Sequence, residues 1–434
     1  MLLLGRRRSL SLIALTAALI GLLVLVGPAG SALAQCGPDP AFDSDGVLVT
    51  DLGTSDELAR GVTALPDGAA IVAGEARYMT AARYLPDGTL DPAFGGGDGI
   101  AQVSHDPIFS SADYDVAVQP DGKVVLAGNA AFAVSGSSGF DIAVARLNPD
   151  GTRDASFGGG DGAVYLDLQG RHDWAAAVAV DSAGRIVVAG HSEPFEGNAS
   201  DAVVVRLLPD GSLDPSFGNQ GIVVVDLGAK NQGVAHGLAV QADGAIVVAG
   251  SYGRVGSGVN PWLGRLLGDG SRDRRFGRKG LVLSSVGGTW YDVTVQPDGR
   301  IVTAGEVLAE LTVARYLPNG KTDDSFGAGG MTRVQVDPSG FLSSRASAVA
   351  IHADGTILAV GAAWATNLSD MAAVALLADG TLDARFGTGG VVHQHDPAGF
   401  NSALQDVALL PNGSALAAGY LGFDWALARY TPCV

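Results

Sequence analysis

The sequence predicts an all-β chain, a seven-bladed β-propeller with four antiparallel strands per blade. The first observation is a repeated pair of apolar runs around a Pro-Asp-Gly turn, as in 118–128, VQPDGKVVLAG. The turn glycine precedes the strand glycine by six residues in all seven copies: Gly68/Gly74, Gly122/Gly128, Gly184/Gly190, Gly244/Gly250, Gly299/Gly305, Gly355/Gly361 and Gly413/Gly419. The second is an Asp-x-x-Phe motif that recurs in step with it, roughly every 60 residues. Short repeats of this kind bury their faces only by stacking, and a closed ring protects the sheet edges.

Each period contains four candidate strands, which in the second period are 115–119, 123–127, 142–147 and 163–168. They are short, rich in Val, Ile and Ala, and bounded by turn residues. We place the strand before the first turn innermost, because small residues recur there at one register: Thr63, Ala117, Ala179, Ala239, Thr294, Ala350 and Ala408. The Ala-Gly strand is then second, the strand with a recurrent arginine third, and the strand after Asp-x-x-Phe outermost.

This strand order predicts how the ring closes. The chain ends on a third strand, 424–430, and begins with an unpaired outer strand, 42–50, so the N-terminal strand completes the last blade. Alignment to the repeat puts Cys36 and Cys433 on adjacent sites of the turn between these two strands. We therefore expect a disulfide that joins the two ends of the chain.

Residues 1–34 have the pattern of a signal peptide, and 35–434 form the single propeller. Arg6–Arg8 precede an apolar core, and a small-residue cleavage site follows at 32–34. No second apolar run reaches membrane-spanning length. We expect a secreted, periplasmic or cell-surface protein, in a compartment where disulfides persist. The alternative is that Cys36 is a lipidated cysteine, although Gln35 stands where a small residue is expected.

The chain is acidic, with 27 Lys and Arg against 45 Asp and Glu and a formal net charge of −18. Nucleic-acid binding needs stripes of basic residues, so this balance argues against nucleic acid and against anionic membranes. We expect a monomer whose partner is a protein or a glycan.

The two motifs together, VQPDGKVVLAG followed by IAVARLNPDGTRDASFGGGDG, resemble the delta-60 repeat of bacterial exported proteins. The resemblance covers essentially residues 38–432 and implies a β-propeller. It implies no catalytic residues. Blade 6 departs from the pattern, because Ala375 stands where the third strand should carry arginine.

Positions that break the repeat are the candidate functional sites. Seven residues before the turn glycine, the inner strands carry Asp115, Asp292 and Asp406 among glycines and alanines. Three carboxylates that converge on the axis could bind Ca²⁺, which takes several oxygen ligands. The alternative is three solvated aspartates. Calcium is the one cofactor the sequence suggests, and we expect no other.

The loops at one face vary in length, and tryptophans gather near them. Trp174, Trp290 and Trp364 are candidate ligand contacts, since tryptophan is enriched at binding surfaces. It also packs blades against one another, which is the alternative. We expect a non-enzymatic binding or cell-surface module that uses this face. The competing hypothesis is an extracellular hydrolase or lyase with a metal-assisted site on the axis. No catalytic residue is assigned.

Overall fold

The computed structural model describes residues 36–54, 57–76, 78–103, 108–134, 137–194, 199–228, 231–336, 342–365 and 368–433. All of them belong to one compact unit, 34–434. The expected signal peptide therefore lies outside the described residues. Among the residues that are described, no helix is long and apolar enough to cross a membrane.

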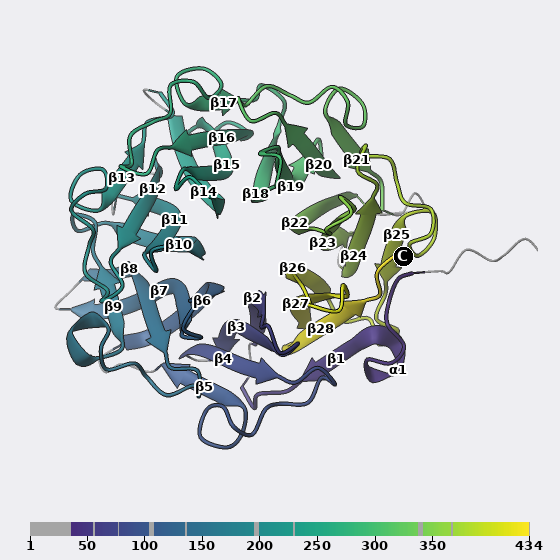
Figure 1. Ribbon diagram of the computed structural model, residues 1–434, viewed down its shortest axis with the longest axis horizontal. Helices are drawn as coiled ribbons and strands as arrows, with labels where there is room; N and C mark the ends of the chain where they lie inside the picture. The colour runs from purple at the N-terminus through teal and green to yellow at the C-terminus, as the bar shows by residue number, and fades with distance from the viewer. Residues whose placement is uncertain are drawn as a thin grey trace, which may run out of the picture. The chain divides into compact units, whose positions relative to one another are not determined.

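The described unit is a ring of seven four-stranded antiparallel sheets, as predicted (Figure 1). Blade 1 consists of β2 (Leu58–Ala64), β3 (Ala70–Ala76), β4 (Tyr78–Tyr84) and β5 (Ile100–Val103). Blade 2 consists of β6 (Ile108–Val118), β7 (Val124–Val134), β8 (Ser137–Leu147) and β9 (Ala163–Leu166). Blade 3 consists of β10 (His172–Val180), β11 (Ile186–Glu193), β12 (Asp201–Leu207) and β13 (Ile222–Val225). Blade 4 consists of β14 (Asn231–Val240), β15 (Ile246–Arg254), β16 (Asn260–Leu266) and β17 (Leu281–Leu283). Blade 5 consists of β18 (Gly288–Val295), β19 (Ile301–Val307), β20 (Glu310–Tyr316) and β21 (Met331–Val334). Blade 6 consists of β22 (Ser343–Ile351), β23 (Ile357–Trp364), β24 (Ser369–Leu376) and β25 (Val391–Gln394). Blade 7 consists of β26 (Ser402–Leu409), β27 (Ala415–Leu421), β28 (Asp424–Tyr430) and β1 (Val47–Thr50).

The predicted strand order is confirmed, with the first strand of each repeat innermost (Figure 1). Three strands of blade 2 extend further than the sequence predicted, whereas its outer strand ends at Leu166, two residues early. The inner strand begins at Ile108, and β7 and β8 continue their ladder to the pair Val134 and Ser137. Across the described ranges the helical segments are two short turns, α1 (Asp43–Gly46) and a 3-10 turn at Gly158–Gly160.

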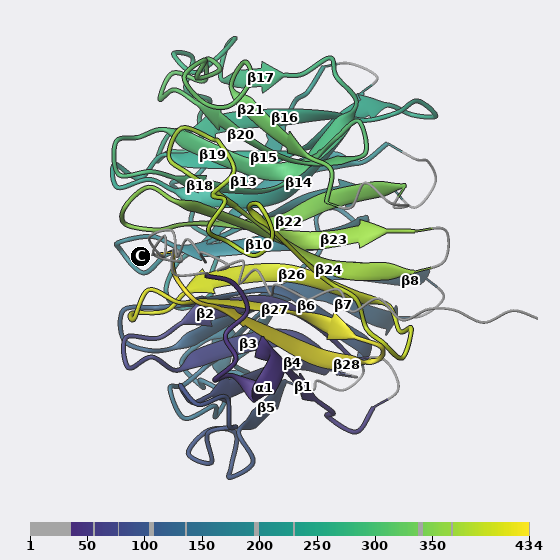
Figure 2. The same ribbon diagram turned by 90° about the vertical axis from the view of Figure 1, so that its right-hand side faces the viewer.

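The ring closes as predicted, with β1 pairing antiparallel to β28 (Figure 2). The register runs from Val47 opposite Ala428 to Thr50 opposite Trp425. Cys36 and Cys433 form a disulfide, and their Cα atoms lie 5.1 Å apart. The carbonyl of Cys36 also accepts a hydrogen bond from the backbone nitrogen of Gly387 in blade 6, at 2.9 Å. Segment 36–50 therefore connects the last two blades.

The core lies between neighbouring blades, and the phenylalanines of the Asp-x-x-Phe motif are buried in it. Each of these rings packs beneath the turn of the next blade. A Cβ on Gly88, which has φ +90°, would lie 2.7 Å from the ring of Phe42. Glycine is required there both for the backbone conformation and for the ring beneath it.

In five of the seven blades the recurrent arginine of the third strand donates to a backbone carbonyl of the following blade; these are Arg146, Arg206, Arg265, Arg315 and Arg429. Arg206 donates from Nε to Asp214 Oδ2 at 2.8 Å and from Nη1 to the Gly268 carbonyl of the following blade at 2.6 Å. Its guanidinium carbon lies 4.4 Å from the centre of the Phe217 ring. Blade 6, which has Ala375 at this position, instead pairs Arg385 with Asp383 at 2.8 Å.

Candidate functional site

A β-bulge interrupts every inner strand at the same register, one residue before the position of the three aspartates. A bulge turns one side chain away from the regular alternation, and bulges are common beside binding sites. The repeat does not conserve the residues at this position. They are Arg60, Tyr114, Ala176, His236, Tyr291, Ser347 and Gln405. The bulges thus present chemically different side chains on the inner strands of successive blades.

Around the bulges of blades 3 to 6, ring-bearing side chains gather on one side. We call Trp174, His191, His236, Tyr291, Arg345 and Trp364 the aromatic–histidine cluster. In blade 3, the ring of Trp174 on β10 stacks on His191 of β11, with centroids 4.7 Å apart. Phe140, from β8 of blade 2, stacks on the other side of Trp174 at 5.6 Å.

The second part of the cluster is built by blades 4 to 6. His236, on the bulge of β14, lies 5.3 Å from the ring of Tyr291, which occupies the bulge of β18. The Nε2 atom of His236 also lies 3.2 Å from Ser251 Oγ. The guanidinium of Arg345, on β22, lies 4.8 Å from the ring centres of both Tyr291 and Trp364. A cation over two aromatic faces is held by both ring quadrupoles.

Electrostatics connects the two parts. Burial lowers the pKa of His191 to about 4. Burial, with smaller contributions from His191 and Arg345, also lowers the pKa of His236 to about 4. Both imidazoles are therefore neutral at pH 7, and each can accept or donate a proton.

Arg345 is the cation of this cluster, and its charge acts on the nearby Glu306. Within the described part of the chain its guanidinium forms no ion pair, and its buried Nε has no hydrogen-bond acceptor. Burial raises the pKa of Glu306, and the charge of Arg345 partly offsets that increase. A cation with unused donors between two rings is suited to a planar carboxylate or another oxyanion.

The structure separates the three candidate tryptophans. Trp174 and Trp364 are half-buried in the aromatic–histidine cluster, whereas Trp290 is only 2% exposed and packs in the core between blades 4 and 5. Sequence reasoning missed His191, His236, Tyr291 and Arg345. The signal that could have found His236 and Tyr291 is that each is a non-repeating residue immediately before the position of the three aspartates.

The carboxylate oxygens of the axial aspartates accept hydrogen bonds from backbone nitrogens. Asp115 Oδ1 accepts from the Val116 nitrogen, and Oδ2 accepts from Val178 of the next blade, both at 2.7 Å. Asp292 bridges to Val349 at 2.8 Å and Asp406 to Val62 at 2.7 Å in the same way. Blades approach closely here, since a Cβ on Gly237 would lie 2.8 Å from the Asp292 Cα. Each carboxylate thus connects two blades, and calcium binding by the three stays a prediction.

These carboxyls give a testable pH dependence. Burial, followed by repulsion from Asp292, raises the pKa of Asp406 to about 7. A carboxyl with a raised folded pKa stabilises the fold at low pH, and that stability is lost as the pH rises through the folded value. The loss begins near the unfolded pKa of about 4 and is nearly complete just above the folded pKa of about 7, so we expect Asp406 to lower the thermal midpoint across this range, in which His191 and His236 affect the wild type and the Asp406 variant alike. Asp406→Asn should reduce that fall, and Asp323→Asn should leave it unchanged. An equal fall in wild type and Asp406→Asn would show that another group titrates.

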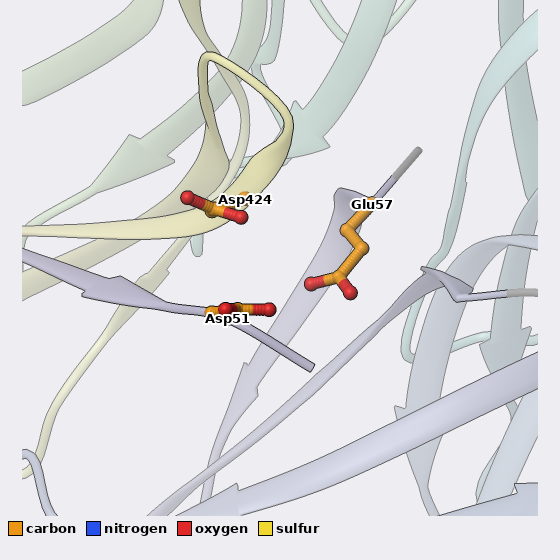
Figure 3. Close-up of side chains that lie close together, drawn as sticks. All are labelled: Asp51, Glu57 and Asp424. Carbon is orange, nitrogen blue, oxygen red and sulfur yellow. The ribbon is translucent and has the colours of Figure 1, made fainter. Parts of the chain in front are cut away.

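Two acidic groups lie at the face of the variable loops. Oxygens of Asp51, Glu57 and Asp424 lie within 4.8 Å of one another where blade 7 meets blade 1 (Figure 3). Asp141, Asp167 and Asp173 form the corresponding group where blade 2 meets blade 3. Glu57 is buried, and its two carboxylate oxygens accept hydrogen bonds from the backbone nitrogens of Leu52 and Thr54 at 2.7 and 2.5 Å. These contacts indicate that Glu57 stabilises the loop after β1.

The fold defines the class of protein as a seven-bladed β-propeller. Six segments match the family described as "Domain of unknown function (DUF5122) beta-propeller", namely 65–94, 119–157, 184–217, 241–276, 296–326 and 352–386. No curated protein sequence matches the chain.

Solved structures share the fold at low identity. A polysaccharide lyase described as an ulvan lyase is 10% identical, with TM-score 0.51, over 91% of this chain and 94% of that one. Drosophila Plexin A in complex with Semaphorin 1b is 11% identical, with TM-score 0.45, over 92% and 88%. A glucose dehydrogenase is 14% identical, with TM-score 0.41, over 89% and 99%. At 10% identity the likeness to the lyase, whose TM-score exceeds 0.5, shows the fold alone.

Proposed function

We propose that this chain is an exported binding module that holds an acidic glycan at the aromatic–histidine cluster. The observation that carries the proposal is Arg345, a cation that lies between the rings of Tyr291 and Trp364 and forms no ion pair with any residue that the structure describes. Carbohydrate sites combine flat apolar surfaces with a few placed polar groups. The rings offer the flat surfaces, and Arg345 offers donors to a uronic-acid carboxylate.

The surroundings of Arg345 fit a small acidic group. The neutral imidazoles of His191 and His236 do not compete with Arg345 for the anion, and they can hydrogen-bond to sugar hydroxyls. The Cys36–Cys433 disulfide supports an oxidising location for the protein. Trp174 and Trp364 contact the ligand in this proposal, and Trp290 supports the site from within the core.

Calorimetric titration with uronic-acid oligosaccharides, such as alginate fragments, tests the proposal. We expect Arg345→Ala to weaken binding at least tenfold, about 1.4 kcal/mol or more, because it removes the charge-assisted contacts. Trp364→Ala should weaken binding by a similar or smaller factor, with the fold intact by circular dichroism. Arg333→Ala, which removes an exposed arginine of the neighbouring blade, serves as the matched control. The proposal is wrong if Arg345→Ala binds as tightly as the control.

A lyase reaction at the same site is the second candidate. It is favoured by the neutral His236 beside Tyr291 and Arg345, since a base next to a carboxylate-binding cation is what β-elimination of a uronic acid requires. The base would take the C5 proton, the C4–O4 bond would break, a C4–C5 double bond would form, and the leaving oxygen would take up a proton. In the titration above, ultraviolet absorbance from the new double bond would identify an enzyme. Binding without that absorbance would identify a binding module.

A further inference from the structure

A basic groove lies on the face of the tight turns, between blades 4 and 5. It encloses about 1040 Å³, and its charged lining consists of Arg265, Arg272, Arg274, Arg275 and Lys279 together with the acidic residues Asp243 and Asp273. The turn before β15 and the segment between β16 and β17 form most of the groove. The inner strands begin at the opposite face, close to the aromatic–histidine cluster. The groove is therefore a separate surface from the proposed glycan site.

The charge of this groove contrasts with the rest of the chain. Residues 265–279 contain six basic side chains and two acidic ones, in a chain with a net charge of −18. The other blades do not repeat this pattern. In blade 3, Leu213, Pro215 and Ser216 stand where blade 4 has Arg272, Arg274 and Arg275. Since the fold of the turn is kept without these cations, the fold does not require them.

Two of the basic residues serve the structure. Arg265 pairs with Asp273 at 2.7 Å and donates to the Pro318 carbonyl at 2.6 Å. Arg272 donates to the carbonyl of Asp226 at 2.5 Å. The side chains of Arg274, Arg275 and Lys279 are exposed and make no hydrogen bond or ion pair within the described part of the chain. Three cations next to a groove are therefore available to an outside partner.

We infer that this groove binds a sulfated or carboxylated polysaccharide. Arginine forks match carboxylate and sulfate oxygens in pairs. The apolar lining is limited to Ala245, Leu267 and Pro318, so the groove offers few of the aromatic anchors typical of protein interfaces or of single-stranded nucleic acid. A DNA duplex would extend past the groove onto acidic surface, which repels it within a screening length of about 8–10 Å. A short acidic glycan can stay within the basic surface.

Fluorescence anisotropy with labelled heparin oligosaccharides tests the inference. We expect binding that weakens as ionic strength rises. The triple variant Arg274→Glu, Arg275→Glu and Lys279→Glu should raise the dissociation constant at least tenfold. The matched control carries Arg254→Glu, Lys321→Glu and Arg333→Glu, which change the net charge by the same amount at exposed sites elsewhere. Its dissociation constant for heparin should rise less than threefold.

Several results would overturn the inference. These are an absence of heparin binding by the wild type, equal losses in the two triple variants, and duplex DNA that binds as tightly as heparin of similar length. Heparin also contains uronic acids, so the titrations are repeated in the Arg345→Ala background, which disables the proposed glycan site; heparin binding at this groove and its loss in the triple variant should be unchanged there. The two proposals therefore fail separately, because each has its own variant and its own ligand-contacting face.

Discussion

Replacing both cysteines with serine is expected to lower the free energy of unfolding by up to about 6 kcal/mol. The two residues are separated by 397 positions, so the bond closes nearly the whole folded chain into one loop. In the chain-entropy model a cross-link restricts the unfolded state more as the loop lengthens, and this loop is close to the longest the chain permits. The figure is an upper value, because that model overestimates many measured disulfides.

The disulfide also protects the weakest point of the ring. Every other blade is a continuous segment of chain, but blade 7 takes β1 from the N-terminus. Four residue pairs between β1 and β28 hold that strand, together with the contacts of segment 36–46. Loss of β1 would expose the edge of β28, and an exposed edge can recruit another chain.

Chemical denaturation of the oxidised protein, the reduced protein and the Cys36→Ser, Cys433→Ser variant measures the effect. Reductant should destabilise the wild type and leave the double variant unchanged, which controls for effects of the reductant itself. Size-exclusion chromatography of the variant should show more self-association. Equal stability of the oxidised and reduced wild type would contradict the expected role of the bond.

The closing strand and the disulfide could be predicted from the sequence because the repeat supplies an internal alignment. Once Asp39-Pro-Ala-Phe42 is matched to Asp91-Pro-Ala-Phe94, the missing strand of the last blade and the place of Cys36 follow. The small residues of the inner strands reflect contacts between blade backbones, so they too were readable. Each of these features depends on a position that the repeat conserves.

The candidate site could not be predicted in the same way. A bulge inserts one residue without changing the local composition, so His236 and Tyr291 read as ordinary strand residues. The residues that contact His236 and Tyr291 come from other blades, and the sequence pattern of one blade does not predict contacts with another. Trp290 and Trp364 look alike in sequence, but only the structure shows that the first is in the core and the second half-exposed. Arg274 and Arg275 were visible as basic residues, but their exposure beside a groove was not.

Arg206→Ala is expected to lower the free energy of unfolding by about 3–5 kcal/mol, the cost typical of breaking a buried ion pair. The side chains of Arg206 and Asp214 are only 2% and 4% exposed. Removing Arg206 takes the hydrogen-bond donor from Asp214 Oδ2, which leaves Arg185 Nη1 at 3.7 Å as the nearest cation, while Ser216 still donates to Oδ1. It also takes a donor from the Gly268 carbonyl and the cation from above the Phe217 ring. Burial opposes ionisation of Asp214, but hydrogen bonds from Ser216 and the charge of Arg206 keep its pKa below the usual range.

The repeat provides a matched control for this prediction. Arg83 occupies the same position in blade 1 and pairs with Asp91 at 3.0 Å, but its side chain is 20% exposed. Water can therefore replace part of what Arg83→Ala removes, and we expect a smaller loss from that variant. The double variant Arg206→Ala, Asp214→Ala should recover part of the loss, because no unpaired carboxylate then remains buried. The denaturant midpoints of the three variants measure their losses of unfolding free energy, provided that the dependence of that free energy on denaturant concentration is the same for all of them. If Arg206→Ala and Arg83→Ala cost the same, burial of the ion pair does not determine its contribution, and the arginine stabilises the ring mainly through packing on the phenylalanine.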